Sequence, residues 1–551
     1  MNYKFSLLLL LPFALFAEKI HWPLNVKSHI SGTFAEFRRP GVLHMGIDIK
    51  TFGMNGFKVL APFQGYVNHL RYSQNSYGLS IDLHSPKTGL SARYAHLLDL
   101  KGKIKGMELF KNAAILLNDG NPFNLNLPAN MFQIGKSMEI ASSGESGSGV
   151  SHLHFELMDR NGYVNPLAYG DFVKNDYHPP VIVKLFVEDS SGRQEIFEAH
   201  KHSEAKYSIR KKIQANGKIR FKVEAYDLIT SANKNNLYQI ELLVGNRKVY
   251  SRKFDQIPYA NYQHEKNLIF DHNRSSLSPP VYVYNLFDSS GFSVDSENIA
   301  KKQNGKIILA DARGNRSELK FILQTNNQTV TEQNKTNRQL FVSGDRQLSL
   351  DFSQSIVYGN PDITIEPLQN VPAELKVNGL VPSGKMYKIE TTNFTWYQPA
   401  RGLIRRAIGN NEALFLYNTE TSRWQTLAHK KRAGQITFEF TRPGIIAIMQ
   451  DNIAPVIRPT YKMTRNIYLE PDPDMILRIY SVSDTGSGLD HRFRVMIENQ
   501  NYPYYYDWDR KAILVEIPKR LSLYRKVIPV YIQASDLAGN KSEWFTDLIR
   551  L

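Results

Sequence analysis

The chain has 551 residues, of which 42% are hydrophobic and 22% charged, so it is expected to fold into about three to five domains and is not intrinsically disordered. The absence of cysteine excludes disulfides and thiolate metal sites. The formal net charge of +16 favours an anionic cell-envelope surface as partner; no nucleic acid is expected, because the sequence has no basic low-complexity tail or nucleic-acid motif.

The N-terminus has the pattern of a secretory signal peptide. One positive charge, Lys4, precedes an apolar run over 5–16, and the small residue Ala17 comes before a polar segment. The apolar run is too short to span a bilayer as a permanent anchor. We therefore expect a signal peptide at 1–17 and export of the remainder to the periplasm, the cell envelope or the extracellular space.

Two short clusters contain residue types that bind zinc or move protons. His44 and Asp48 are four residues apart and His152 and His154 are two apart, so each pair is expected to share a face of a strand or helix turn. Together the two faces can offer three metal ligands and one further histidine, which suits a catalytic zinc site with an open position for water. Either pair alone is weak evidence, because an H-x-H is often part of a surface strand.

The surroundings of both clusters alternate between polar and apolar residues, as strands do. This holds for 46–50 and for 152–157, and the second stretch follows a flexible Gly/Ser run at 142–149. A third histidine, His96, ends another strand-like run at 93–97, where a neutral imidazole can carry protons. Taken alone, His96 fits a buried structural histidine better than a catalytic one.

These residues belong to a longer series of short motifs. The series consists of G-V-L-H-M-G-I-D-I at 41–49, A-P-F-Q-G-Y-V at 61–67, S-Y-G-L-S-I-D-L-H at 76–84, R-Y-A-H-L at 93–97, I-G-K-S at 134–137 and S-H-L-H-F-E-L at 151–157. It resembles the lysostaphin/LytM family of zinc endopeptidases, which cut peptide cross-links or stem peptides of bacterial peptidoglycan. The resemblance covers roughly residues 29–170, with the motifs in the family's order.

The resemblance implies a mostly antiparallel β peptidase domain over 18–175, with a narrow groove floored by zinc. By position, one Zn²⁺ per chain would be held by His44, Asp48 and His154. His96 and His152 would be the catalytic histidines beside the open coordination position. There is no H-E-x-x-H motif to supply a glutamate base, so these histidines would handle the protons. For Glu156 we favour a structural role or one behind the ligands.

The chain departs from the family pattern at two places. Residues 100–132 replace a short turn, and 107–117 within them predict a short helix followed by an Asn- and Pro-rich loop. This insertion can border the groove as a lid or substrate-selecting element, or be a tolerated surface insertion. The second departure is Ser151, where relatives often have proline, and we expect it to change little.

Beyond residue 175 the pattern changes to β-rich segments separated by Gly, Asn and Asp turns. A linker at 176–180 is followed by a predicted β-sandwich module at 180–325, a β-rich module at 340–450 and an immunoglobulin-like module at 453–551. The Asn-, Gln- and Thr-rich run at 325–338 predicts a second linker. The predicted fold class is thus mainly β, with two to three sandwich domains after the peptidase domain.

The downstream modules show a repeated turn but no catalytic constellation. The A-D-x-x-G-N turn at 310–315, which recurs with serine for alanine at 535–540, is typical of the end of bacterial immunoglobulin-like sandwiches. Its aspartates are expected to cap the turns rather than to bind calcium. The aromatic run at 502–508 can be a glycan-stacking surface, although an edge strand with one buried face is the commoner structure.

Three functions fit these patterns in decreasing order. The first is a zinc endopeptidase that hydrolyses peptide bonds in bacterial peptidoglycan during cell-wall remodelling. The alternative is a non-catalytic LytM-type regulator that binds peptidoglycan and activates other wall hydrolases. A scaffold or adhesion protein, the third, leaves the histidine clusters unexplained. The sequence predicts neither the bond cut nor the oligomeric state.

Overall fold

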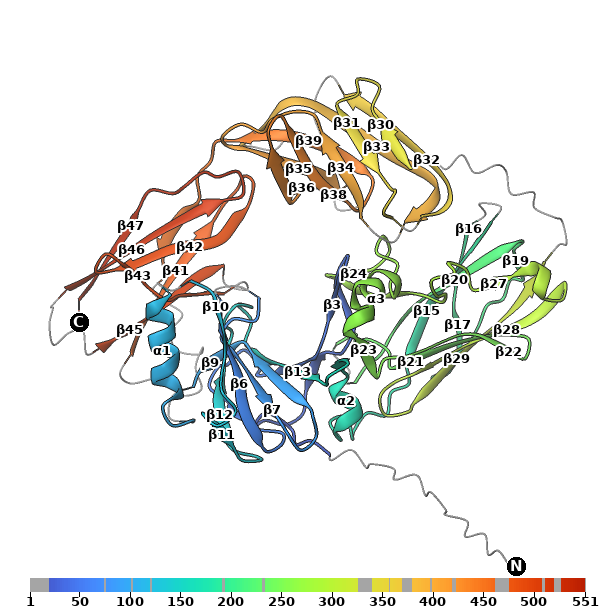
Figure 1. Ribbon diagram of the computed structural model, residues 1–551. Coiled ribbons are helices and arrows are strands. Elements are labelled where there is room, and N and C mark those ends of the chain that lie inside the picture. Colours follow the sequence, from blue (N-terminus) through green and yellow to red (C-terminus); the bar gives the residue numbers. More distant parts are fainter. Residues whose placement is uncertain are drawn as a thin grey trace, which may run out of the picture.

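A computed structural model describes residues 19–550, apart from 74–75, 101–102, 119–120, 191–193, 230–232, 326–338, 356, 369–378, 397–398, 419–422, 461–474, 508–510 and 520–526. The described chain is mainly β and forms four successive units, which curve round in Figure 1 from the blue N-terminal unit to the red C-terminal one. Among these residues, no helix is long and apolar enough to cross a membrane. The predicted signal peptide at 1–17 and nearly all of the predicted linker at 325–338 lie outside the described residues.

The first unit is built on one large antiparallel sheet. Its strands follow the order β1 (Ile30–Gly32), β4 (Ile47–Lys50), β13 (His152–Met158), β8 (Ser91–Ala95), β7 (Ser80–His84), β6 (Gly65–Tyr72) and β10 (Phe123–Asn126), with β11 (Gln133–Ile134) beside β6 and β14 (Gly162–Val164) beside β13. Along β13, Leu153, Phe155 and Leu157 are fully buried in the core of this unit. Because strand side chains alternate, His152 and His154 face the opposite side of the sheet.

Smaller elements complete the first unit. They are the sheet β5 (Lys58–Leu60), β12 (Glu139–Ser143) and β9 (Leu97–Asp99), the hairpin β2 (Glu36–Arg39) and β3 (Val42–His44), and the helices α1 (Met107–Leu117) and α2 (Pro166–Tyr169). Helix α2 begins at a proline, and the Asn165 side chain caps it by accepting from the Leu167 amide at 3.0 Å. Helix α1 has the bounds predicted for it within the insertion, and the insertion also adds β10 at the sheet edge four places from β13.

The second unit is a sandwich of two sheets around a shared core. One sheet contains β16 (Gln194–Glu198), β15 (Val181–Asp189), β20 (Lys218–Tyr226), β26 (Val283–Asn285) and β27 (Val294–Asp295); the other contains β17 (His200–Ser203), β18 (Lys206–Ser208), β19 (Ile213–Gln214), β29 (Arg316–Gln324), β28 (Lys302–Ala310), β21 (Gln239–Val244) and β22 (Arg247–Lys253). Its remaining elements are β23 (Gln256–Pro258), β24 (Ser276–Leu277), β25 (Pro280–Val281), η1 (Tyr259–Asn261), α3 (Tyr262–Leu268) and η2 (Ser296–Asn298). In its last strand, β29, buried side chains alternate with exposed or partly exposed ones, as expected of a strand with one face in the core.

The first and second units share a core. The hairpin β2–β3 leaves the first unit, and its buried side chains pack in the same cluster as those of the second: Phe34, Ala35, Phe37, Leu43 and Met45. The rings of Phe37 and Phe270 meet edge to face with centroids 5.6 Å apart. In addition, β23 pairs with β14 and so adds a strand of the second unit to the sheet of the first. The two units are therefore joined by packing as well as by the chain.

The third and fourth units are also two-sheet sandwiches, each with its own core. The third contains β30 (Leu340–Val342), β31 (Leu348–Asp351), β34 (Ala400–Ile404), β38 (Gln435–Phe440) and β37 (His429–Arg432) in one sheet, and β32 (Val357–Leu368), β33 (Leu380–Trp396), β39 (Gly444–Asp451), β35 (Glu412–Asn418) and β36 (Arg423–Thr426) in the other. The fourth contains β40 (Val456–Pro459), β41 (Met475–Ser483), β45 (Ala512–Pro518) and β44 (Tyr505–Asp507), facing β43 (Gln500–Asn501), β42 (Leu489–Ile497), β46 (Val527–Asp536) and β47 (Phe545–Arg550). An immunoglobulin-like topology for these units stays a prediction.

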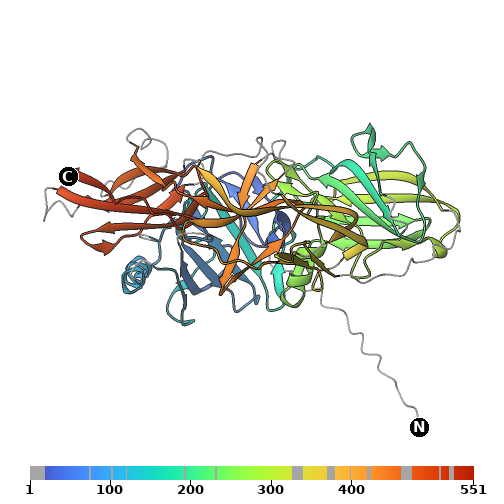
Figure 2. The same ribbon diagram turned by 90° about the horizontal axis from the view of Figure 1, so that it is seen from above.

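The fourth unit, although it is last in the sequence, lies beside the first. Both views show it beside α1 (Figure 1, Figure 2). Burial raises the pKa of Tyr72 on β6, and Tyr504 of the fourth unit adds to the rise. Tyr504 and Tyr506 are buried, and β44 is an edge strand, so the described part of the aromatic run, 502–507, has the buried face that the commoner interpretation predicted; residue 508 lies outside the described residues.

Candidate metal centre

Two of the predicted ligands lie on the neighbouring strands β4 and β13, beside the end of β8. Asp48 on β4 is paired with His154 on β13, and His154 is in turn paired with Ala95, the last residue of β8. His96 follows at once, in the left-handed region with φ +59°. Such a conformation is uncommon for a residue with a side chain and is concentrated at functional sites. His44 belongs to a different element, because it is the last residue of β3 in the hairpin β2–β3.

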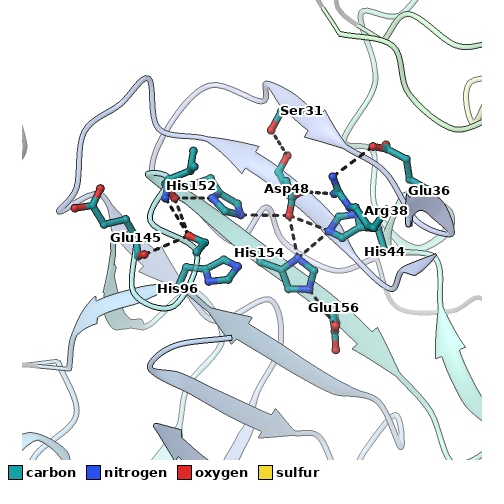
Figure 3. Close-up of polar contacts among 12 residues, drawn as sticks. Ser31, Glu36, Arg38, His44, Asp48, His96, Glu145, His152, His154 and Glu156 are labelled. Atoms are coloured by element: carbon teal, nitrogen blue, oxygen red, sulfur yellow. Dashed lines mark hydrogen bonds and ion pairs between the residues drawn. The ribbon is translucent and has the colours of Figure 1, made fainter. Parts of the chain in front are cut away.

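Three ligand-type atoms form a nearly equilateral triangle (Figure 3). His44 Nε2, Asp48 Oδ1 and His154 Nδ1 are each 2.9 Å from the other two. Zinc bonds of about 2.0–2.2 Å in a tetrahedral site place ligand atoms roughly 3.3 Å apart, so the observed triangle is close to the required size. These residues form a group that can bind a metal.

The hydrogen bonds on the outer side of the ligands show that lone pairs point inward. His44 Nδ1 lies 2.8 Å from the carbonyl oxygen of Thr33, which only accepts, so this nitrogen donates and Nε2 keeps its lone pair. His154 Nε2 donates in the same way to Glu156 Oε1 at 3.0 Å, which leaves Nδ1 as an acceptor. When His154 is neutral, these two nitrogens and the carboxylate of Asp48 are three acceptors that face one another without a donor between them. A cation satisfies all three.

The charges around the ligands favour positive charge at the centre. Burial and the positive charge of Arg38 lower the pKa of His44 to about 4, so its ring is neutral at physiological pH. Burial opposes ionisation of Asp48, but His44 and Arg38 outweigh it and hold the pKa of Asp48 well below its usual range. Burial also acts to lower the pKa of His154, yet hydrogen bonds to Asp48 and Glu156 raise it to about 9. The centre therefore attracts positive charge.

Two further histidines stand beside the triangle. His152 Nδ1 donates to the Val150 carbonyl at 2.8 Å, and its Nε2 lies 3.5 Å from Asp48 Oδ1. His96 Nδ1 donates to the Ser146 carbonyl at 2.9 Å, so its Nε2 is an acceptor. Burial lowers the pKa of His96 well below its usual range, and its ring centroid is 4.6 Å from that of His152. In both imidazoles, Nδ1 is therefore hydrogen-bonded to a backbone carbonyl, whereas Nε2 makes no backbone hydrogen bond.

A row of charged side chains crosses the sheet behind the ligands. Glu156 accepts from His154 at 3.0 Å and from Arg93 at 2.8 Å, and Arg93 in turn binds Asp82 at 3.0 and 3.1 Å. The Tyr77 hydroxyl donates to Glu156 at 2.5 Å. Burial favours a neutral Glu156, but His154 and Arg93 lower its pKa to about 2. These contacts place Glu156 behind the metal ligands, which is one of the roles that the sequence favoured for it.

The second unit contributes to the surroundings of the metal ligands. Thr33, whose carbonyl fixes His44, accepts through its hydroxyl oxygen from the Asn236 amide at 2.9 Å. Burial raises the pKa of Glu36, and Arg38, 3.6 Å away, and Tyr282 of the second unit act to lower it. Arg38 then donates to Asp48 Oδ2 at 2.6 Å, leaving Oδ1 for the metal. Contacts from another unit thus reach two of the three ligands.

The sequence interpretation missed several of these residues. Arg38 and Glu36 carry no motif, and their positions depend on a hairpin that folds against another unit. The available signal was the charged residues within apolar strands, such as Arg93 in 91–95 and Asp82 in 80–84. One expectation was wrong: His44 and Asp48 do not share one strand or helix turn, because the chain bends between β3 and β4.

Comparisons with known proteins return limited similarity. No protein-family model matches the chain, and no curated protein matches it. Among solved structures, a variant of the catalytic domain of the prophage-encoded M23 protein EnpA from Enterococcus faecalis is 21% identical, with 28% of this chain and 98% of that chain covered and a TM-score of 0.19. The catalytic domain of the antimicrobial peptidase lysostaphin from Staphylococcus simulans is 19% identical, with 24% and 79% covered and a TM-score of 0.17. We draw no argument from TM-scores this low.

Proposed function

We propose that this protein is a zinc-dependent endopeptidase that hydrolyses peptide bonds in bacterial peptidoglycan. One observation carries the proposal: three acceptor atoms of His44, Asp48 and His154 converge at 2.9 Å, with two further histidines beside them. Two neutral imidazoles and one carboxylate leave a bound zinc with one net positive charge. Zinc held there would act as a Lewis acid and lower the pKa of a bound water toward 7.

The two remaining histidines have the properties that proton transfer requires. His96 and His152 each use Nδ1 to donate to a backbone carbonyl, and so each keeps Nε2 for a water or a substrate. One can take a proton from the attacking water, and the other can give a proton to the leaving amine. Because His96 is buried and neutral, it begins the reaction as an acceptor.

Peptidoglycan as substrate is supported by the motif series at 41–157 and by the net charge. The order and content of those motifs resemble the lysostaphin/LytM family, and the formal charge of +16 suits an anionic envelope. The proposal includes export by the segment at 1–17, because a wall hydrolase must reach its substrate outside the cytoplasm.

The test uses the full mature chain. We expect about one zinc per chain by elemental analysis and release of new amino groups from purified peptidoglycan. His154→Ala should abolish both. The matched control is His202→Ala, because His200 and His202 form a second H-x-H pair on β17, exposed and outside the acceptor triangle. Wild-type protein that holds zinc but releases no amino groups would favour the regulator, and protein without zinc would contradict the metal centre.

A further inference from the structure

Two other acidic groups lie where units of the protein join. In each group three aspartates bring carboxylate oxygens within 4.8 Å of one another: Asp176, Asp227 and Asp311 in the first, and Asp451, Asp484 and Asp536 in the second. The first group lies at the start of the second unit, and the second at the boundary between the third and fourth units. Neither belongs to the proposed zinc centre.

The two groups are built from equivalent positions. Their first aspartates lie four residues before the same P-V-I tripeptide, in D-Y-H-P-P-V-I at 176–182 and D-N-I-A-P-V-I at 451–457. The second members, Asp227 and Asp484, directly follow β20 and β41. The third members open the two D-x-x-G-N turns. The same arrangement thus occurs twice in the described part of the chain.

Turn capping accounts for only part of these carboxylates. Asp311 Oδ1 accepts from three backbone amides of its turn, at 2.7–2.9 Å, as the sequence analysis expected. Asp176 uses one oxygen for the His178 amide at 3.1 Å. Asp227, which is 2% exposed, leaves Oδ1 without any hydrogen bond, and Asp484 leaves its own Oδ1 without one at the equivalent position.

A neutral oxygen lies beside the first group. Asn235 is fully buried, and its side-chain oxygen accepts no hydrogen bond. Its backbone pairs with Asp227 through two hydrogen bonds of 2.9 Å, so the two side chains stand on the same side of the ladder. Two acceptor atoms without partners are therefore buried side by side.

Little positive charge balances the first group: burial outweighs His178 and Arg313, which act to lower the pKa of Asp176. No lysine or arginine among the described residues forms an ion pair with Asp227 or Asp311, and the nearest imidazole, His178, is 3.9 Å from Asp176. Burial raises the pKa of Asp176 to about 6 and that of Asp227 well above its usual range. Buried carboxylates without a counter-charge are costly to ionise unless a cation binds.

We propose that each acidic group binds one Ca²⁺ ion and that the ion fixes the junction at which the group lies. All ligand atoms in both groups are oxygens, which hard divalent cations prefer. The zinc centre differs, because it offers two nitrogens and one oxygen. Calcium accepts six to eight oxygens at about 2.3–2.6 Å, so oxygens up to roughly 4.8 Å apart can share one ion. Backbone carbonyls and water would complete the coordination.

The surrounding contacts show why an ion there would stiffen a junction. Asn315 of the first D-x-x-G-N turn donates to the Asp176 carbonyl at 3.2 Å, and Asn540 of the second donates to the Asp451 carbonyl at 2.9 Å. Ala312 packs against the core of the first unit, and Ala538 is buried with side chains of the third. Each ion would therefore tie a turn of one unit to the segment that enters from the unit before it.

The proposal is tested by calcium titration of the full mature chain, freed of divalent ions and reloaded with one equivalent of zinc. Calorimetry should detect two Ca²⁺ sites per chain. Asp227→Asn and Asp484→Asn should each lose one site, and the double variant both. Asp288→Asn is the control, because Asp288 caps a turn of the second unit outside both groups, and it should keep two. An absence of calcium binding, or two sites in the double variant, would overturn the proposal.

Thermal unfolding distinguishes aspartates that bind an ion from aspartates that only stabilise the fold. Calcium should raise the Tm of the wild type, and more than the same concentration of Mg²⁺ does. Without calcium, Asp227→Asn should unfold no earlier than the wild type, because the change removes an unbalanced buried charge. An equal loss of Tm with and without calcium would contradict the proposal, and equal stabilisation by Mg²⁺ would overturn the choice of ion.

Discussion

His152 and His154 are two residues apart on one strand, yet their surroundings differ. Both ring nitrogens of His154 are occupied, one by the acceptor triangle and one by Glu156. His152 has one nitrogen on a backbone carbonyl and the other turned toward Asp48 at 3.5 Å. The first arrangement suits a metal ligand and the second a group that exchanges protons.

His152→Ala should therefore keep the zinc and lose turnover. We expect zinc content close to one per chain and a decrease in kcat of about 10²–10⁴-fold, the usual contribution of a general acid or base. The measurement is elemental analysis together with hydrolysis of defined muropeptides, whose products are weighed by mass spectrometry. Loss of zinc in this variant would show that His152 is a ligand instead.

Glu156→Gln should weaken zinc binding without removing a ligand. The amide oxygen can still accept from His154, but the negative charge that orients and polarises the ring is lost. Changes behind metal ligands typically cost about 10–100-fold in affinity, and we expect a loss in that range by competition with a chromogenic chelator. Glu139→Gln, which alters a carboxylate paired with Lys103 outside the centre, should bind zinc as the wild type does.

At the scale of elements, the turn between β3 and β4 positions two ligands at once. It passes over β13 so closely that a Cβ on Gly46 would lie 2.4 Å from the Phe155 carbonyl oxygen. Gly46→Ala must therefore push β3 away from β13, and we expect a lower Tm and loss of zinc. Gly135→Ala is the control, because a Cβ at Gly135 would meet nothing within 4 Å. Equal behaviour of the two variants would show that the turn tolerates displacement.

The elements near the site were largely predictable from local pattern. Alternation located β4 and β13, apolar spacing located α1 with its bounds, and motif order brought His44, Asp48, His96, His152 and His154 together. Arg38 and Tyr282 could not be found this way, because their contacts join residues far apart in the sequence through a hairpin between two units. The buried aspartates were predictable as turn caps, but their convergence depends on how units dock.

At the scale of the whole molecule, the first unit depends on the second. Phe34, Phe37, Leu43 and Met45 are buried in the shared core, and burying such a side chain contributes about 1.5–3 kcal/mol. A chain of residues 18–175 alone would expose them, so we expect aggregation or a lower Tm and weaker zinc binding. A chain of residues 18–325 should match the full protein in zinc affinity. A stable, zinc-loaded 18–175 fragment would contradict this dependence.

The shared core also bears on how such a chain can be rearranged during evolution. Recombination that separates coding segments near residue 175 would leave two incomplete cores, whereas a break after Thr325 separates clusters that have no member in common. Residues 18–325 are thus expected to be inherited as one block, while the third and fourth units are free to be exchanged or lost. In relatives of this protein, the sequence of the first unit should be found with that of the second more often than with the later units.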